Sequence, residues 1–507
     1  MKRSIVVYPF LFAIFPVLAL YVHNIGELYL SSIWIPLGMA FGLAILLFII
    51  SWAIFRNALK AGLVATALII IFFADGHISK VLVSWGFPRV AKYLPIVWVI
   101  CFIVIVYFVA RTRRQLNNVT AILNVIGVGL ILVTSINIIV NNVTSPSIKT
   151  QNTVGLDTNP SEASTLPDIY YIILDSYENA STLQNVFGYD NSGFVEYLQG
   201  KGFYVANESV SNYAYTQASL ASSLDMDYIN YVSDEVGNRS KALKIQMEML
   251  KNNSVLNSLK SMGYYCVNIE SRDIGYNKYA DLNIGLDKAK TSWVIEPSSF
   301  ELTLVGTTLV DRFWSHYPLY LAIYRAYTLN TLDKLAEMPD LKGPKFVFAH
   351  VTCPHDPWVF DANGGEVKTG SSPESPGWQQ KYVDQVQFIN GKIEKLVDEI
   401  LSKSKTPPVI ILQGDHGTRD YDLWYHCKGV TSDQCMQDTF GILNAYYLPN
   451  ADETLLYEAI SPVNSFRVVF NSYFATEYEM LPDECYYSNP FVYPYDFVNV
   501  TSEVIHH

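Results

Sequence analysis

The sequence has few charged residues, little cysteine and no excess of positive charge. Charged side chains make up 16% of the 507 residues, and their formal sum is −12 at pH 7. A polyphosphate backbone is bound by a basic surface, so this balance argues against nucleic acid as a partner. The six cysteines include no C-x-x-C pair, which argues against a structural zinc site. Internal repeats are also absent.

One pair of cysteines lies close together in a polar segment. Cys427 and Cys435 lie within the polar segment HCKGVTSDQC, whereas Cys101 lies within an apolar run. Two interpretations remain open for the pair: buried free thiols, or a disulfide if the compartment is oxidising.

Long apolar runs are missing after about residue 140 and are concentrated before it. Five apolar segments span residues 4–22, 33–55, 61–73, 93–110 and 119–140. At about 1.5 Å per residue, four of them can cross a hydrocarbon core of about 30 Å. The third segment is short because its uncharged stretch ends at Asp75. It must extend backwards or tilt in order to span, or it is a buried half-helix.

Basic residues in the short loops predict the orientation of these segments. The loops that we assign to the cytoplasmic side contain Lys2, Arg3, Arg56, Lys60, Arg111, Arg113 and Arg114. Lys80, Arg89 and Lys92 in an opposite loop weaken the contrast. No small-residue cleavage site follows the first segment, so we interpret it as a retained helix. We therefore expect a multi-pass cell-membrane protein whose residues after 140 lie outside the cytoplasm of a bacterial-type envelope.

The remainder of the chain has the pattern of an α/β domain. We expect a transmembrane domain over 1–140, a linker rich in Asn, Thr, Ser and Pro over 141–166, and an extracytoplasmic domain over 167–507. Apolar runs at 168–175, 264–271, 345–351 and 408–415 predict strands of a largely buried sheet. Helical periodicity covers 240–262, 300–335 and 378–404.

Two of the expected strands end in potential metal ligands. Asp175 ends the first, and Asp415, His416 and Gly417 end the last. Because functional groups in open α/β sheets collect where strands end, the fold can bring these three ligands together. A lone Asp-His-Gly is equally compatible with a simple turn after a strand.

Thr216 and two histidines complete the set of candidates. Thr216 opens the run TQASLASSLDM, where its hydroxyl serves either as a helix N-cap or as a nucleophile beside free backbone N–H groups. His350 and His355 follow another strand in FAHVTCPHDPWVF and are either structural or functional.

The order of these parts resembles the sulfatase-like branch of the alkaline phosphatase superfamily. With the preceding apolar segments, the chain is similar to lipoteichoic acid synthases and phosphoethanolamine transferases, in which about five membrane helices precede an extracytoplasmic catalytic domain. The resemblance covers most of the chain in layout, but specific motifs match only around Asp175, Thr216, His355, Asp415 and His416. It implies an α/β sandwich with a mostly parallel central sheet.

The resemblance also implies roles for individual residues. Asp175, Thr216, Asp415 and His416 would hold one divalent metal, and Thr216 would carry a covalent phospho-intermediate. His355 would face the substrate, and we also assign His350 to the substrate-binding residues.

Two departures from the family pattern narrow the expected activity. Sulfatases carry C/S-x-P-x-R at the nucleophile, whereas this chain has Thr216 followed by QASL, which argues against sulfate-ester hydrolysis. Asp175 is followed by Ser176 rather than by a second acid, which fits a one-metal transferase better than a sulfatase.

We therefore expect a phosphotransferase that moves a phospho-alcohol headgroup from a phospholipid or lipid-linked donor to an envelope glycan at the membrane. The donor set suits Mn²⁺, Zn²⁺, Mg²⁺ or Ca²⁺ and does not choose among them. The alternatives are a sulfatase or phosphodiesterase acting on surface carbohydrate esters, and a non-catalytic envelope scaffold.

Overall fold

The protein is described by a computed structural model, which covers residues 5–144, 166–287, 298–313, 317–367, 377–418 and 433–505. Most of the expected linker lies outside these ranges, and so does Cys427, one of the two cysteines of the possible bridge. The chain forms two compact units. A helical unit comprises residues 1–145 and 295–318, and a sheet unit comprises residues 146–294 and 319–507.

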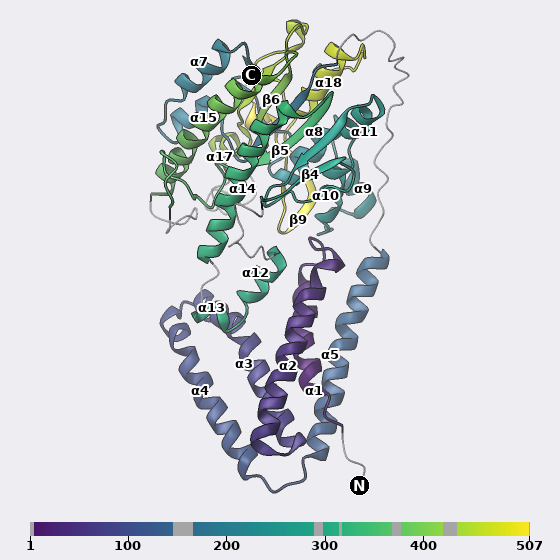
Figure 1. Cartoon of the computed structure of the whole chain (residues 1–507), viewed down its shortest axis with the longest axis vertical. Helices are drawn as coiled ribbons and strands as arrows, with labels where there is room; N and C mark the ends of the chain where they lie inside the picture. The colour runs from purple at the N-terminus through teal and green to yellow at the C-terminus, as the bar shows by residue number, and fades with distance from the viewer. Residues whose placement is uncertain are drawn as a thin grey trace. The chain divides into compact units, whose positions relative to one another are not determined.

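The helical unit contains four helices that are long and apolar enough to cross a membrane. Its long helices are α1 (Tyr8–His23), α2 (Trp34–Phe55), α3 (Ala58–Ser84), α4 (Pro88–Arg111) and α5 (Asn117–Thr144) (Figure 1). A fifth apolar helix, α1, has only 16 residues. The sequence pattern was therefore wrong about which segment is short: it is the first, not the third. The helix α3 begins at Ala58, three residues before the expected segment, and continues forward through Asp75 to Ser84, so most of its extra length comes from the forward extension that was not expected.

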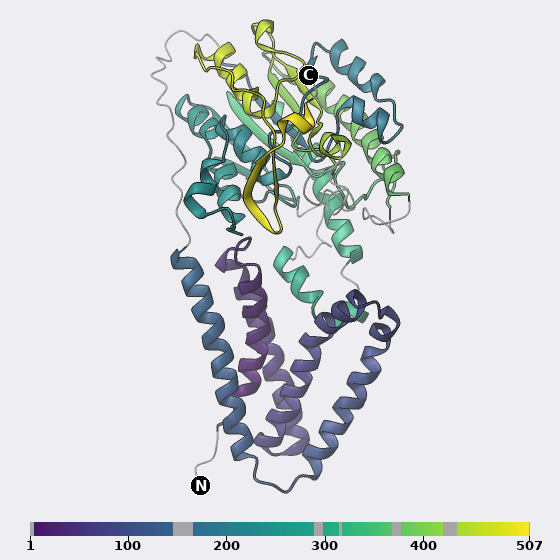
Figure 2. The same ribbon diagram turned by 180° about the vertical axis from the view of Figure 1, so that it is seen from behind.

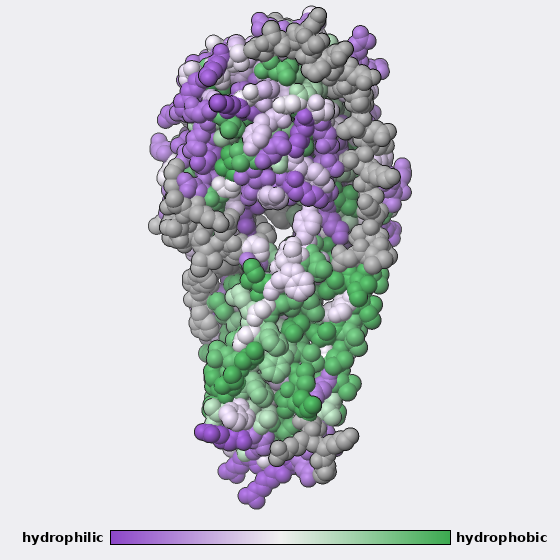
Figure 3. Space-filling view, turned by 45° about the vertical axis from the view of Figure 1, so that its right-hand side comes forward, coloured by the Kyte–Doolittle hydropathy of each residue, from purple (hydrophilic) through white to green (hydrophobic). Residues whose placement is uncertain are grey.

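The outward surface of this unit is hydrophobic. Large apolar side chains along α2, α4 and α5 are exposed, including Trp34, Ile100 and Ile136. Figure 3 shows the resulting continuous hydrophobic surface, with hydrophilic side chains gathered at one end of the bundle. Because backbone polar groups inside these helices are bonded internally, such a surface is suited to hydrocarbon rather than water. By length and composition, these helices make the chain a membrane protein.

A later segment of the chain packs into the helical unit, which the apolar pattern did not predict. This segment contains α12 (Ser299–Val305) and α13 (Val310–Phe313). Backbone bonds join Gly76 N–H to Thr307 O at 3.0 Å and Leu309 N–H to Phe72 O at 2.8 Å. A Cβ at Gly76 would lie 2.6 Å from backbone atoms of Thr307, so only glycine permits this approach.

The same contact explains why α3 tolerates an acid. Asp75 is buried, and its carboxylate accepts hydrogen bonds from Arg312 Nε at 2.5 Å and Trp98 Nε1 at 3.0 Å. A charge removed from water is stabilised when it is paired and hydrogen-bonded. The carboxylate therefore does not end the helix.

The sheet unit is built on a seven-stranded sheet with the order β2-β7-β6-β1-β5-β3-β4. Its strands are β1 (Ile169–Leu174), β2 (Tyr204–Val205), β3 (Tyr265–Ile269), β4 (Leu282–Ile284), β5 (Lys345–Val351), β6 (Val409–Gly414) and β7 (Asn444–Tyr447). The pairs from β6 through β1, β5 and β3 to β4 are parallel, whereas β7 and β2 are antiparallel additions. This confirms the predicted α/β fold with a mostly parallel sheet, and the four expected strands are β1, β3, β5 and β6.

Helices cover both faces of this sheet (Figures 1 and 2). One face packs against α7 (Ser192–Gly200), α14 (Tyr317–Glu337) and α15 (Trp378–Lys403), and the other against α8 (Thr216–Asp225), α11 (Ser254–Ser261) and α18 (Pro462–Tyr473). Successive side chains of β1 alternate between them: Tyr170 and Ile172 join the first core, and Tyr171 and Ile173 the second. Because both faces are buried, the strand is apolar throughout.

The remaining elements include two corrections to the expected helices. The predicted helix over 240–262 is two helices, α10 (Lys244–Lys251) and α11, because the side chain of Asn253 caps the second by accepting from Leu256 N–H at 2.7 Å. The predicted helix over 300–335 is divided among α12, α13 and α14. The other named elements are α6 (Ala180–Asn185), α9 (Tyr231–Val236), α17 (Asp433–Phe440), α19 (Thr501–Val504), β8 (Tyr486–Asn489), β9 (Tyr493–Asn499) and the 3-10 turns at Leu30–Ile33, Met338–Asp340 and Glu453–Leu455.

Candidate metal centre

The register of the central strands places the two strand-end acids side by side. Leu174 of β1 pairs with Gly414 of β6, so the residues that follow, Asp175 and Asp415, leave the sheet next to each other. On the other side of β1, Ile173 pairs with His350 of β5. Three segments far apart in sequence therefore converge at the carboxyl ends of three adjacent parallel strands.

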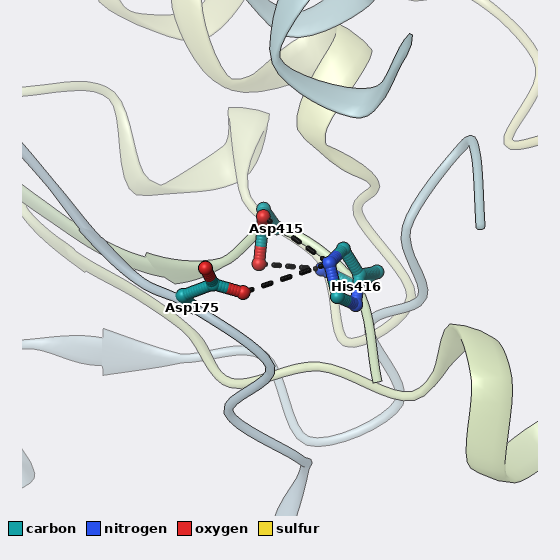
Figure 4. A group of neighbouring side chains, drawn as sticks. All are labelled: Asp175, Asp415 and His416. Atoms are coloured by element: carbon teal, nitrogen blue, oxygen red, sulfur yellow. Dashed lines mark hydrogen bonds and ion pairs between the residues drawn. The ribbon is translucent and has the colours of Figure 1, made fainter. Parts of the chain in front are cut away.

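Asp175, Asp415 and His416 form a buried cluster whose ligand atoms all lie within 4.8 Å of one another. The Nε2 atom of His416 lies 3.4 Å from Asp415 Oδ2 and 3.6 Å from Asp175 Oδ1. Figure 4 shows the two carboxylates and the imidazole pointing toward a common centre. Two carboxylate oxygens and one imidazole nitrogen are ligand types that a divalent cation uses.

A hydrogen bond to the backbone fixes the orientation of the His416 ring. Its Nδ1 lies 2.8 Å from Gly417 O. A carbonyl oxygen only accepts, so Nδ1 carries a proton and Nε2 faces the carboxylates, where it can bind a metal once it has released its own proton. Histidines that hold metals are commonly fixed in this way, by donating from the other ring nitrogen to a carbonyl.

The two carboxylate oxygens of Asp415 differ in their hydrogen bonding. Its Oδ1 accepts from the backbone N–H groups of Ser176 and His416, each at 3.0 Å. Its Oδ2 is buried and has no hydrogen-bond partner among the described residues. Because a buried carboxylate oxygen without a donor is costly, this atom fits a metal ligand.

The electrostatics of the two acids differ. Burial and the neighbouring charge of Asp415 raise the pKa of Asp175 to about 6. Burial also opposes ionisation of Asp415, but His416, His350 and the Ser176 N–H together hold its pKa below the usual value. A bound cation would compensate both negative charges at once.

Thr216 is the first residue of α8, and its hydroxyl points into the same cluster. Thr216 is buried, and its Oγ1 lies 3.2 Å from His416 Nε2. The N-cap position belongs to Tyr215, and no side-chain capping bond is formed. Thr216 therefore does not act as the N-cap, which was the alternative interpretation. N–H groups in the first turn of a helix lack intrahelical acceptors, and they favour an anion at this point.

The two histidines of the β5 segment occupy different environments. His350 is fully buried, with Nε2 3.3 Å from Asp175 Oδ2 and Nδ1 3.2 Å from Ser271 Oγ. It therefore faces the carboxylates rather than solvent. His355 has a side chain 30% exposed, and its ring centroid lies 6.2 Å from that of His416. Of the two, His355 has the position suited to meeting a substrate.

Ser176 is a site residue that sequence reasoning had noted only as a departure. It adopts a positive φ of 59° directly after Asp175. This conformation is uncommon for a residue other than glycine, and it directs the Ser176 N–H to Asp415 Oδ1. The strained backbone at Ser176 therefore lies at the point where a hydrogen bond links the segments of the two strand-end acids.

Glu178 is a second residue that the sequence did not single out. It is fully buried, and its Oε1 accepts from the backbone N–H of Thr418 and from Thr418 Oγ1, the latter at 2.6 Å. Its Oε2 has no partner among the described residues, and burial raises its pKa well above the usual value. Glu178 therefore connects the loop after β1 to the loop after β6. Nothing in the local pattern DSYEN distinguishes it from a surface acid.

We expect Glu178→Gln to bind metal almost as the unmodified protein does, and Glu178→Leu to bind it roughly 10 to 100-fold more weakly. Glutamine keeps an oxygen that accepts from Thr418, whereas leucine leaves two donors of Thr418 unsatisfied. Titration of purified protein with metal, followed by metal analysis, measures this. Glu196→Leu, at an exposed position of α7, is the control. Equal affinities for both Glu178 variants would contradict a positioning role.

Comparisons with known proteins are informative only at the level of solved structures. No protein-family profile matches the chain, and no curated protein matches it. The C-terminal periplasmic domain of EcEptC from Escherichia coli is similar, with 14% identity, a TM-score of 0.43, and coverage of 68% of this chain and 94% of that chain.

Two further structures show comparable similarity. The lipooligosaccharide phosphoethanolamine transferase A (EptA) from Neisseria meningitidis has 12% identity and a TM-score of 0.42, covering 93% of this chain and 96% of that one. The lipoteichoic acid synthase LtaP from Listeria monocytogenes has 12% identity and a TM-score of 0.38, covering 66% and 76%. Both kinds of protein that the sequence resembles are thus among the solved structures to which this chain is similar.

Proposed function

We propose that the chain is a metal-dependent phosphotransferase that moves a phospho-alcohol headgroup from a lipid donor to an envelope glycan through a phospho-threonine. One observation carries the proposal. The Thr216 hydroxyl, at the start of α8, lies 3.2 Å from the His416 nitrogen that also faces Asp175 and Asp415. A hydroxyl beside two carboxylates and an imidazole, with free N–H groups next to it, is arranged for nucleophilic attack on an anionic centre.

Asp175, Asp415, His416 and Thr216 would hold one divalent cation. The cation, when bound, lowers the pKa of the hydroxyl and offsets charge on the phosphoryl oxygens. Asp415 Oδ2 fits this role because it is buried without a donor. The identity of the metal is not determined by these ligands.

In the first half-reaction, Thr216 Oγ1 forms a bond to phosphorus as the bond from phosphorus to the donor alcohol breaks. Thr216 loses one proton and the departing alcohol gains one, so the protons balance. His355, exposed beside the cluster, is the group that we assign to protonate the departing oxygen. The N–H groups of the first turn of α8 orient the phosphoryl oxygens.

In the second half-reaction, an acceptor hydroxyl loses its proton and forms a bond to phosphorus, the bond from phosphorus to Thr216 Oγ1 breaks, and Thr216 Oγ1 takes up one proton. Membrane helices in the same chain favour a lipid donor, because tethering raises the effective concentration of lipid headgroups. The acceptor is proposed to be an envelope glycan because such a glycan would lie at the same membrane as the lipid donor.

A transfer assay tests the proposal. Membranes from cells that express the full chain are supplied with phospholipid labelled in the headgroup. The expected result is label on cell-surface polymer. Release of free labelled headgroup alone would indicate a hydrolase. If the labelled phospholipid keeps its headgroup whether or not metal is present, the proposal is overturned.

A further inference from the structure

The end of α8 remote from Thr216 borders a cavity that the proposed reaction does not use. The cavity has a volume of about 320 Å³ and lies among the last residue of α8, the start of α9, and α11 and α18. Asp225 in its wall comes nine residues after Thr216, which is about 14 Å along the helix. This volume is within the range of small-molecule sites, and the cavity is separate from the metal centre.

Two carboxylates make the cavity negative. Asp225 Oδ1 accepts from Ser254 N–H at 2.9 Å and Ser254 Oγ at 3.2 Å, and Asp227 lies two residues further along. Of the described residues, no cation acts on Asp225, and burial together with Asp227 raises its pKa to about 6. The carboxyl end of α8 carries partial negative charge of the same sign. A cationic ligand would relieve this repulsion.

The single cation in the described wall is Arg467, and its guanidinium is engaged by the backbone. Its Nε and Nη2 donate to Met226 O at 2.9 and 2.6 Å, and its Nη1 donates to Glu479 O at 2.7 Å. It interacts electrostatically with Asp227. One guanidinium against two carboxylates leaves the cavity with a net negative charge.

Aromatic rings complete the wall. Tyr228, Tyr231 and Tyr478 line the cavity, and the Arg467 guanidinium lies 5.7 Å from the Tyr478 ring centroid. Tyrosine rings attract organic cations through their faces, whereas a bare metal ion needs neither rings nor this volume. We propose that this cavity binds an organic ammonium group, as carried by an amino sugar or by an amino alcohol headgroup. The proposal does not depend on the reaction at Thr216.

Binding to the full chain in detergent, followed by saturation-transfer NMR and calorimetry, tests the proposal. The probes are glucosamine, ethanolamine, N-acetylglucosamine and inorganic phosphate. We expect glucosamine or ethanolamine to bind, and the tighter of the two identifies the source as a sugar or a headgroup. N-acetylglucosamine, which lacks the charge, should bind at least tenfold more weakly than glucosamine.

Two variants locate the binding. Asp225→Asn retains an oxygen for Ser254 and removes the charge, and Tyr231→Leu removes a ring; each should weaken ammonium binding at least tenfold. Asp496→Asn, at an exposed position of β9, should leave it unchanged. Thermal melts confirm that each variant is folded.

Three outcomes would overturn the proposal: equal binding of N-acetylglucosamine and glucosamine, displacement of the amine by phosphate, or ammonium binding unaffected by Asp225→Asn. Thr216→Ala should bind the amines normally. Failure of this proposal is therefore distinguishable from failure of the proposed transferase reaction.

Discussion

Thr216→Ala is expected to lower transfer by roughly 10⁴-fold or more, because it removes the atom that forms the covalent intermediate. The hydroxyl lies 3.2 Å from His416 Nε2 and is not used as a helix cap, so its loss leaves α8 intact. The measurement combines transfer of labelled headgroup with the intact mass of the peptide containing Thr216. Unmodified enzyme incubated with membranes should show a headgroup-sized adduct on this peptide, and the variant should show none.

Two further substitutions control for the effect of altering α8. Thr216→Ser keeps a hydroxyl at the first helical position and should retain the adduct. Ser219→Ala removes another buried hydroxyl of the same helix, one that has no partner among the described residues, and should retain transfer. An adduct on any other residue, or undiminished transfer by Thr216→Ala, would rule out the phospho-threonine.

Asp415→Asn is expected to abolish stoichiometric metal binding while preserving the fold. Asparagine can keep the oxygen that accepts from Ser176 and His416, but it removes the charge at the buried Oδ2. Loss of a direct ligand should weaken metal binding by at least the roughly 10 to 100-fold typical of outer-shell changes. Metal content of purified protein measures the loss.

The same variant also makes a prediction about stability without and with metal. Without metal, the pKa of Asp415 is held below its usual value, so its charge is net stabilising in the fold and the variant should melt at a lower temperature than the unmodified protein. With saturating metal, the unmodified protein should gain stability through binding, whereas the variant should not. Asp361→Asn, outside the cluster, should respond to metal as the unmodified protein does. A similar rise in melting temperature on adding metal to both proteins would contradict the assignment of Asp415 as a ligand.

The strands and their ends were predictable because the signals are local. An apolar run buried on both faces is recognisable in β1 and β6, and in-register parallel pairing then brings Asp175 next to Asp415. The start of α8 at Thr216 followed from the run of small and apolar residues after it. These features need only the neighbouring sequence and the geometry of a parallel sheet.

Features that depend on distant partners were missed. The extension of α3 past Asp75 requires Arg312, 237 residues away, because only pairing offsets the burial of its charge. Likewise, Glu178 acquires its position from Thr418, 240 residues away. The local sequence around Asp75 or Glu178 does not distinguish either acid from one that is exposed to solvent.

The sequence by itself determined the apolar helices, the buried parallel strands and the identity of the residues at their ends, since hydrophobic periodicity and apolar runs are properties of neighbouring side chains. Only the tertiary structure decided that Thr216, Asp175, Asp415 and His416 share one centre, that Glu178 links two of its loops, and that residues 295–318 belong with the helical unit. The physical reason is that a buried polar group is stable only with a partner, and the partners here come from remote parts of the chain.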